Sequence, residues 1–352
     1  NALDSLEIIQ AALEVPIGCA RLSHTVKPGM KILITVDDSS RSTRTDLMLP
    51  MILQELAAAA IPRRAIRILI ALGTHRRMSR REMEDKYTAP VVEKYSFINP
   101  DWQDRASYQS IGSSSAGFDI RIHKAILESD FVIGVGQTIP HMIAGFGGGC
   151  KIINPGCADG STIAEMHWLS STVAEDGLFA VRDNAVRKVI DEIGIKAGLK
   201  FILNDVPDSH GQVAGAFAGD PILAHRQACE FARRTCLVPI REQTDIVLAD
   251  SYPADLDFWQ ALKALNAACG TVKKGGTVIL VTPCPEGASS QHHELTTYGY
   301  MPEEKIRAMV ASGQLDKCVG GNMYLGRKLL EKARVILVSR GISRPTRRPI
   351  AM

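Results

Sequence analysis

Short apolar runs rich in β-branched residues alternate with helical patterns along the chain, and this alternation constrains the fold more than any other sequence feature. The apolar runs predict strands over residues 31–36, 66–72, 131–135, 201–203, 246–249, 277–281 and 335–338. Apolar residues at helical spacing predict helices over residues 1–15, 46–59, 178–193, 224–235, 256–268, 303–311 and 324–332. Strands that alternate with helices indicate α/β layers with mainly parallel sheets.

The length of 352 residues is sufficient for two domains with separate hydrophobic cores. A new strand–helix–strand unit begins just after residues 237–244, so we expect a domain boundary there. We predict an N-terminal, cofactor-binding catalytic domain over residues 1–240 and a C-terminal α/β domain over residues 241–340. Residues 341–352 are expected to form a terminal extension, with a return to the N-terminal domain as an alternative.

The composition is that of an ordinary globular protein, with 45% hydrophobic and 22% charged residues and a formal net charge of +3. This charge is too small to indicate nucleic-acid binding, and no apolar stretch reaches the roughly 20 residues that span a bilayer. The eight cysteines are scattered without a CxxC pair, and we expect no secretory signal, which together predict a cytoplasmic protein with reduced thiols. A local basic cluster fits a solvated helix face and an anion-steering patch equally well; it consists of Arg76, Arg77, Arg80 and Arg81.

Polar side chains follow three of the predicted strands directly. Asp37 and Asp38 follow the first strand, the Gly-Thr-His turn ending at His75 follows the second, and Gln137 follows the third. Because the carboxyl ends of parallel strands form the ligand crevice in such folds, these groups are predicted to converge on one site.

A glycine-rich segment over residues 140–151 combines His141 with Lys151, and His167 follows sixteen residues later. Imidazoles transfer protons or bind metals near neutral pH, and a desolvated lysine can act as a nucleophile. Clustered glycines, including Gly148 and Gly149, allow the backbone to approach a bulky ligand closely. The segment therefore predicts a site for a large cofactor, although it lacks the residues around the lysine that define a P-loop.

Taken one by one, His75, His141 and His167 each fit a structural histidine, and none has the spacing of a helical metal clip. If a metal is bound, the protein is expected to supply one imidazole and an organic cofactor the other ligands. An arginine of the turn over residues 38–44 has the donors to hold a carboxylate through two hydrogen bonds, and the same turn fits a helix N-cap.

Gln260 and Lys263 lie three residues apart on a predicted helix and therefore share a face, for which solvent exposure is the usual explanation. His292 and His293 lie in a loop rich in Ser and Gln, and we predict both at the surface.

Taken together, these motifs resemble the nickel-dependent lactate racemase family, across most of the chain. The step of ten residues from His141 to Lys151 and the further sixteen to His167 agree with the pattern of that family. The segments that carry the resemblance are residues 38–41, 73–76, 140–151, 154–156, 167 and 259–263.

The resemblance implies a nickel-pincer nucleotide, the nickel complex of pyridinium-3,5-bisthiocarboxylic acid mononucleotide, in a cleft between the two domains. Carried over to this chain, Lys151 would tether the cofactor and His167 would be the protein ligand to nickel. Asp38, Gly148 and Gly149 would line the cofactor site. The resemblance also implies that other proteins synthesise and deliver the cofactor.

The same resemblance implies a racemase or epimerase of 2-hydroxy acids that works by reversible hydride transfer, with His75 and His141 as the acid/base pair. Arg41 and Lys263 would hold the substrate carboxylate, and Asp38 and Gln260 would orient groups around it. Arg44, which stands near the position where family members often have proline, would add a second cation.

Trp259 stands where family members commonly have tyrosine, so the substrate stays open among lactate, malate, other short hydroxy acids and aldonates. Two other functions remain as alternatives: a Schiff-base lyase that uses Lys151 as its nucleophile, and a non-catalytic protein that binds the nickel nucleotide. The oligomeric state is open.

Overall fold

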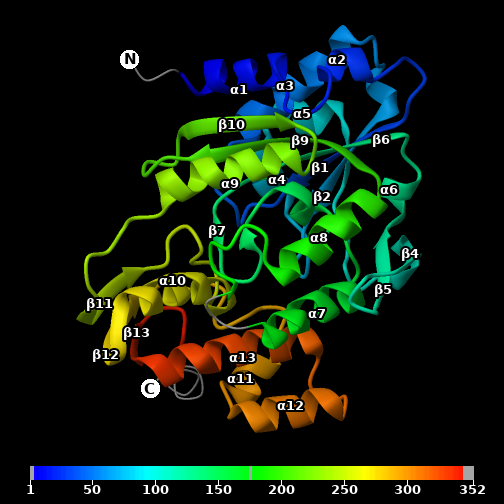
Figure 1. Ribbon diagram of the computed structural model, residues 1–352. Coiled ribbons are helices and arrows are strands. Elements are labelled where there is room, and N and C mark those ends of the chain that lie inside the picture. Colours follow the sequence, from blue (N-terminus) through cyan, green and yellow to red (C-terminus); the bar gives the residue numbers. More distant parts are fainter. Residues whose placement is uncertain (1–3, 174–176, 344–352) are drawn as a thin grey trace. The chain divides into compact units, whose positions relative to one another are not determined.

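The computed structural model describes residues 4–173 and 177–343, and the chain divides into two compact units (Figure 1). Unit 1 comprises Asn1–Ile163 and Glu175–Val238, and unit 2 comprises Ala164–Ala174 and Pro239–Met352. The segment Ala164–Ala174 thus belongs to unit 2, although both of its neighbours in sequence belong to unit 1. Most of the predicted terminal extension, residues 344–352, lies outside the described residues.

Unit 1 is built on a six-stranded sheet in the order β10-β9-β6-β1-β2-β3. Neighbouring strands are parallel except that β10 runs antiparallel to β9. Every residue of β1 and β6 is buried, as expected for central parallel strands that are covered on both faces. The strand bounds are β1 (Ile32–Asp37), β2 (Ile66–Ala71), β3 (Ser96–Ile98), β6 (Phe131–Gln137), β9 (Leu199–Pro207) and β10 (Val213–Gly219).

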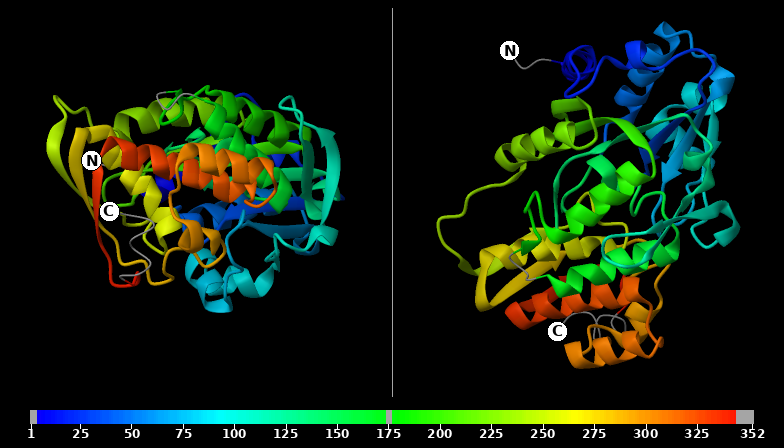
Figure 2. Two further views of the ribbon diagram at one scale, coloured as in Figure 1. Left: turned by 90° about the horizontal axis from the view of Figure 1, so that it is seen from below. Right: turned by 45° about the vertical axis from the view of Figure 1, so that its right-hand side comes forward.

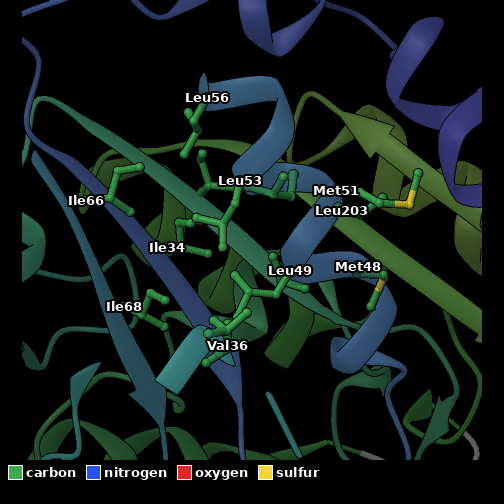
Figure 3. Close-up of a cluster of buried hydrophobic side chains, with 14 of the residues drawn as sticks. Ile34, Val36, Met48, Leu49, Met51, Leu53, Leu56, Ile66, Ile68 and Leu203 are labelled. Atoms are coloured by element: carbon green, nitrogen blue, oxygen red, sulfur yellow. The ribbon is translucent and has the colours of Figure 1, made fainter. Parts of the chain in front are cut away.

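Helix α3 (Thr45–Ala58) covers the centre of one face of this sheet. Figure 3 shows its apolar side chains, among them Met48 and Leu49, against Ile34 and Val36 of β1 and neighbouring side chains of β2. Helix α9 (Leu223–Cys236) packs along β9 and β10 (Figure 1). The other helices of unit 1 are α1 (Ser5–Glu14), α2 (Leu22–Thr25), α4 (Arg80–Tyr87), α5 (Ala89–Lys94), α6 (Lys124–Leu127) and α8 (Ala185–Lys196).

Two small antiparallel pairs complete the strands of unit 1. One pair is formed by β4 (Tyr108–Ser113) and β5 (Asp119–His123), and the other by β7 (Pro140–His141) and β8 (Gly145–Phe146). The second pair places His141 at the start of the glycine-rich segment.

Unit 2 contains a parallel three-stranded sheet of β11 (Thr244–Asp250), β12 (Val272–Val281) and β13 (Arg334–Val338). Helices α12 (Glu303–Ala311) and α13 (Lys317–Lys332) lie side by side (Figure 2), joined by a 2.9 Å ion pair between Lys328 Nζ and Glu303 Oε2. The remaining helices are α10 (Phe258–Thr271), α11 (Glu294–Tyr298) and α7 (Gly160–Leu169), whose sequence crosses the boundary between the units.

The predicted α/β class with mainly parallel sheets is confirmed, and each of the seven predicted strands coincides with an observed one. Two predicted helix starts are wrong. The helix predicted from residue 178 begins at Ala185, because Asn184 caps it, and the helix predicted from residue 324 begins at Lys317, because Asp316 caps it. β3, β10 and the two small strand pairs were missed, since β3 has only three residues and alanine, glycine or polar residues are frequent in the others.

The local basic cluster is largely paired within or beside α4. Arg76 lies 2.8 Å from Glu82, Arg80 lies 2.5 Å from Glu84, and Arg81 lies 3.8 Å from Asp85. This pairing favours the solvated helix face over an anion-steering patch.

All eight cysteines are thiols, since none is in a disulfide. Among the described residues, no helix is both long and apolar enough to cross a membrane.

Ile34 provides a test of the core of unit 1, because its side chain is fully buried between the sheet and α3. We expect Ile34→Ala to lower the free energy of unfolding by about 2–5 kcal/mol through lost burial and the remaining cavity. Ile195→Ala on α8, where the side chain is 46% exposed, is the matched control and should change stability by only about 0.5 kcal/mol. Equal losses in urea denaturation of the two variants would contradict this packing.

Candidate active site

The polar groups that follow the strands lie along the carboxyl edge of the unit 1 sheet, as predicted. Asp37 ends β1 opposite Ala71 at the end of β2, and Gln137 ends β6 opposite Asp205 of β9. The turn that leads to His75 follows β2 directly. Residues far apart in sequence are therefore brought to one edge by strand register.

Asp38 and His75 form the closest pair at this edge. The Asp38 Oδ2 atom lies 2.5 Å from His75 Nδ1, and Ser40 Oγ donates to Asp38 Oδ1 at 2.6 Å. Burial alone would raise the pKa of Asp38, but His75, Arg41 and Ser40 together hold it well below its usual range. An ionised Asp38 favours the His75 tautomer that carries its proton on Nδ1, which makes Nε2 the nitrogen with the lone pair.

Lys86 of α4 fixes the backbone of the turn that carries Arg41. Its Nζ atom donates to the carbonyl oxygens of Arg41 at 2.6 Å and Thr43 at 2.8 Å, and lies 3.9 Å from Asp37 Oδ1. Thr43 Oγ1 donates to Asp37 as well. A buried acid and an ammonium group thus both hold the turn.

Gln137 and Asp205 hold the other end of the same turn. Ser42 Oγ donates to Gln137 Oε1 at 2.9 Å, and the Arg44 backbone N–H donates to Asp205 Oδ2 at 3.0 Å. Burial, together with nearby Asp37, raises the pKa of Asp205 to about 7 despite the Arg44 hydrogen bond. Asp205 Oδ1 is buried and has no hydrogen-bond partner among the described residues.

The Arg44 side chain has its own partners. Its Nε and Nη2 atoms donate to the two carboxylate oxygens of Asp46 at 2.9 and 2.8 Å, and Nη1 donates to Gln212 at 3.1 Å. A substrate carboxylate would have to replace Asp46 at this guanidinium.

His141 is held differently from His75. Its Nδ1 atom accepts hydrogen bonds from the backbone N–H groups of Ile143 at 3.1 Å and Ala144 at 3.2 Å. These two donors favour the neutral tautomer with the proton on Nε2. The two candidate acid/base residues therefore have different partners at Nδ1, a carboxylate for His75 and two amides for His141.

Gly148 and Gly149 have positive φ angles of 71° and 59° and are closely packed by protein atoms. A Cβ atom at Gly148 would lie 2.6 Å from Asn204 Oδ1, and one at Gly149 would lie 2.7 Å from His225 Cγ. The Gly149 N–H donates to Asn204 Oδ1 at 2.7 Å. Protein packing alone therefore requires glycine at both positions, and their contact with a cofactor stays a prediction.

Lys151 lies in a 3₁₀ turn over Gly149–Ile152, with its side chain in a desolvated environment. Desolvation first, and then the positive charges of Arg41 and Arg187, lower the pKa of Lys151 to about 7, while Asp38 opposes the shift. A large fraction of this lysine is therefore the neutral, nucleophilic amine near neutral pH.

His167 belongs to unit 2 and lies half-buried in α7. Its carbonyl accepts a 2.6 Å hydrogen bond from Ser170 Oγ, and the backbone of α13 approaches it closely at Gly321. A Cβ atom at Gly321 would lie 2.8 Å from the His167 carbonyl oxygen, so glycine permits this helix contact.

Gln260 and Lys263 also belong to unit 2, on the first turns of α10. Lys263 Nζ donates to Gln260 Oε1, and the Gln260 N–H donates to the capping Asp257 at 2.9 Å. The prediction that His292 lies at the surface is wrong: it is only 6% exposed, because its ring stacks on Trp259 with centroids 4.1 Å apart. His293 is exposed, as predicted.

Across residues 4–173 and 177–343, no three His, Cys, Asp or Glu side chains are grouped so that they could hold a metal ion by themselves.

Comparison with known proteins gives two family matches and several relatives. Residues 1–177 match the lactate racemase N-terminal domain, and residues 240–351 match the lactate racemase C-terminal domain. The chain is 32% identical to the lactate racemase of Lactiplantibacillus plantarum over 302 residues, which are 84% of this chain and 70% of that protein. It is 32% identical to the lactate racemase of Thermoanaerobacterium thermosaccharolyticum over 286 residues, which are 80% of this chain and 66% of that protein.

Two solved structures share the fold. The lactate racemase apoprotein from Thermoanaerobacterium thermosaccharolyticum superimposes with a TM-score of 0.84 at 29% identity, covering 96% of this chain and 81% of that one. A protein from Thermotoga maritima superimposes with a TM-score of 0.79 at 20% identity, covering 99% and 91%, and supports the fold alone.

The fold and these matches define an α/β isomerase of the racemase class. Within this class, the chain belongs to the lactate racemase family.

Substitution of Gly149 tests the packing of the glycine-rich segment. Gly149→Ala combines a positive φ with a collision against His225, whereas Gly198→Ala has a φ of 96° and no atom within 4 Å of the new Cβ. We expect both variants to lose about 1 kcal/mol from the strained φ, and Gly149→Ala to lose about 1–3 kcal/mol more. Urea denaturation measures both, and equal losses would show that His225 does not press on Gly149.

The raised pKa of Asp205 predicts that the stability of the protein depends on pH. Because the pKa of the folded carboxyl, about 7, lies above that of the unfolded chain, folding takes up a proton between these values. The stabilising contribution of the protonated group is complete below about pH 4 and is lost as the pH rises through 7. Asp205→Asn should therefore become more stable relative to the unsubstituted protein as the pH rises from 4 to 7. A difference independent of pH, measured by urea denaturation across this range, would contradict the raised pKa.

Proposed function

We propose that this protein is a racemase or epimerase of 2-hydroxy acids that depends on a nickel-pincer nucleotide. The observation that carries the proposal is the arrangement in unit 1, where an ionised Asp38 orients His75 and a lysine with a lowered pKa lies within electrostatic range of Asp38 and Arg41. Membership of the lactate racemase family supports the reaction class.

The chain has residues that fit such a cofactor. The Lys151 amine, with a pKa of about 7, is suited to a covalent tether. Asn154, three residues further on, is fully buried, and neither polar atom of its amide has a partner among the described residues. An unsatisfied buried amide is a donor and acceptor in place for a polar ligand.

In this proposal Lys151 tethers the nucleotide, and His167 supplies the one imidazole that binds nickel, a metal that imidazole ligands suit. Asp38, Gly148 and Gly149 line the cofactor site. When bound, the nickel-pincer nucleotide supplies a reversible acceptor for the hydrogen on C2 of the substrate.

The side chains of this chain would bind the substrate and move its hydroxyl proton. Arg41 and Lys263 hold the substrate carboxylate, with Gln260 oriented through its hydrogen bond from Lys263. His75 accepts the hydroxyl proton at Nε2, and Asp38 stabilises the resulting imidazolium. His141 is proposed for the other enantiomer, because a racemase needs a base on each side of the substrate. To accept a proton at Nε2, its ring must move its own proton to Nδ1 and give up the hydrogen bonds from the Ile143 and Ala144 N–H groups.

The partners of Arg44 support a small monocarboxylate such as lactate over a doubly anionic substrate. Since Asp46 already occupies the guanidinium fork, a second substrate carboxylate would gain little there. Malate and aldonates remain the alternatives that a panel of hydroxy acids would reveal.

We propose a cytoplasmic location, which the eight thiols support, and loading by cofactor-synthesis proteins of the same cell.

Variants of the proposed residues separate cofactor binding from turnover. We expect Lys151→Ala and His167→Ala to lose nickel after expression with the cofactor-synthesis proteins. His75→Ala and His141→Ala should retain nickel but lose about 10²–10⁴-fold in kcat, since each removes an acid/base group. Metal analysis and a chiral assay measure the two effects, with His293→Ala on the exposed neighbour of His292 as the control. Normal nickel content and racemisation in His167→Ala would refute the assignment.

A Schiff-base lyase would also need a lysine with a pKa of about 7, as Lys151 has, and a separate experiment tests this second function. Borohydride treatment of metal-free protein with a carbonyl substrate would trap a covalent adduct on Lys151 in a lyase. We expect no adduct.

A protein that carried nickel and cofactor absorbance but isomerised no hydroxy acid would instead be a non-catalytic carrier.

A further inference from the structure

Arg187 is an unusual residue for which the proposed reaction gives no role. It lies on α8, and its side chain is fully buried. A buried guanidinium is strongly unfavourable unless its donors are matched by acceptors. Its nearest carboxylate is Asp191, 3.5 Å from Nη1, which is outside good hydrogen-bonding distance.

The guanidinium instead donates to three carbonyl groups of the glycine-rich segment. Nε donates to Ala144 at 3.1 Å, Nη1 donates to Gly148 at 3.3 Å, and Nη2 donates to Phe146. A planar fork of donors with fixed geometry thus binds carbonyls at every second residue of one loop.

Other groups donate hydrogen bonds to the loop carbonyls that Arg187 does not contact. Asn184 Nδ2 donates to Ile143 at 3.0 Å, the Ala180 N–H donates to Gly145 at 3.1 Å, and His225 Nε2 donates to Gly147 at 2.8 Å. Each carbonyl from Ile143 to Gly148 therefore accepts a hydrogen bond from outside the loop.

His225 is fixed in the role of donor. It is fully buried on α9, and its Nδ1 accepts a 3.0 Å hydrogen bond from Arg226, which leaves the proton on Nε2. Burial, and after it the charge of Arg187, lower the pKa of His225 well below its usual value, so the ring stays neutral.

The loop held in this way connects two residues of the proposed reaction, His141 at its start and Lys151 at its end. Three of its four glycines, Gly145, Gly148 and Gly149, have positive φ angles, and glycine gives the backbone no intrinsic preference for this path. We propose that Arg187, together with His225, is a positioning residue. It fixes His141 and Lys151 relative to each other by donating hydrogen bonds to the carbonyls between them. This inference rests on the proposed function for its catalytic consequence.

The charge of Arg187 has a second effect at Lys151. The charged groups that act on this amine are Arg41 and Arg187, which lower its pKa, and Asp38, which raises it. Removing Arg187 should thus make Lys151 harder to deprotonate as well as less well placed.

Hydrogen exchange of the apoprotein tests the positioning role without any turnover. In Arg187→Met, we expect the amides of residues 141–151 to exchange about tenfold faster or more, with β1 and β2 unchanged. Arg187→Lys should accelerate exchange to a similar extent, because an ammonium cannot bind three carbonyls as a fork does. Arg182→Met is the matched control, since Arg182 lies at the surface and pairs with Asp183 and Glu230. Loop exchange equal to that of the control would overturn the proposal.

The pH profile of Lys151 acetylation by acetic anhydride, followed by mass spectrometry of the apoprotein, separates charge from hydrogen bonding. Arg187→Met should move the profile to higher pH, whereas Arg187→Lys should keep it, and a profile that Arg187→Met leaves unmoved would count against the proposal. If Arg187→Met fails to fold, His225→Phe removes the donor to Gly147 alone and should accelerate exchange of the same loop.

In the loaded enzyme, we expect Arg187→Lys to lower kcat by about 10²-fold with KM nearly unchanged, because His141 and Lys151 are displaced while Arg41 is not. A change confined to KM would overturn the role at these two residues. If the unsubstituted protein racemises no hydroxy acid but its loop still depends on Arg187, the proposed function fails and the positioning role stands.

Discussion

A polar group that leaves water must find a hydrogen-bond partner, and in unit 1 this constraint shapes both loops of the candidate site. The turn over residues 38–44 is held by Lys86, Gln137 and Asp205, and the glycine-rich loop is held mainly by Arg187 and His225. In both cases, side chains from the core form hydrogen bonds with backbone groups of the loop. The loops can therefore be irregular and still keep one conformation, which an acid/base site requires.

The same constraint distinguishes the two candidate acid/base residues. Asp38 faces Nδ1 of His75, whereas two amide donors face Nδ1 of His141, so the two rings favour opposite neutral tautomers. A reaction that works in both directions needs two bases but does not need them to be alike.

The main strands and the polar groups at their carboxyl ends were predictable from the sequence, because β-branched runs such as residues 31–36 and 131–135 are followed directly by polar groups. The pairing of Asp38 with His75 was not, since it depends on a contact between turns 37 residues apart. Arg187 and His225 were missed because they lie in helices whose polar residues look solvent-exposed by spacing alone. Asp205 had a weak signal, as part of an Asn-Asp pair at the end of an apolar run. The contact of Gly148 and Gly149 with a cofactor stays a prediction, and protein packing also requires glycine at both positions.

The most direct test of the account follows the hydrogen on C2 of the substrate. Loaded enzyme is incubated in ordinary water with one enantiomer of lactate deuterated at C2, and the opposite enantiomer is isolated and analysed by mass spectrometry. Reversible hydride transfer predicts that the product retains the deuterium, because the abstracted hydrogen returns to the same molecule without exchanging with water. Product that carries solvent hydrogen at C2 would show that a base removes this hydrogen as a proton, and would contradict the account.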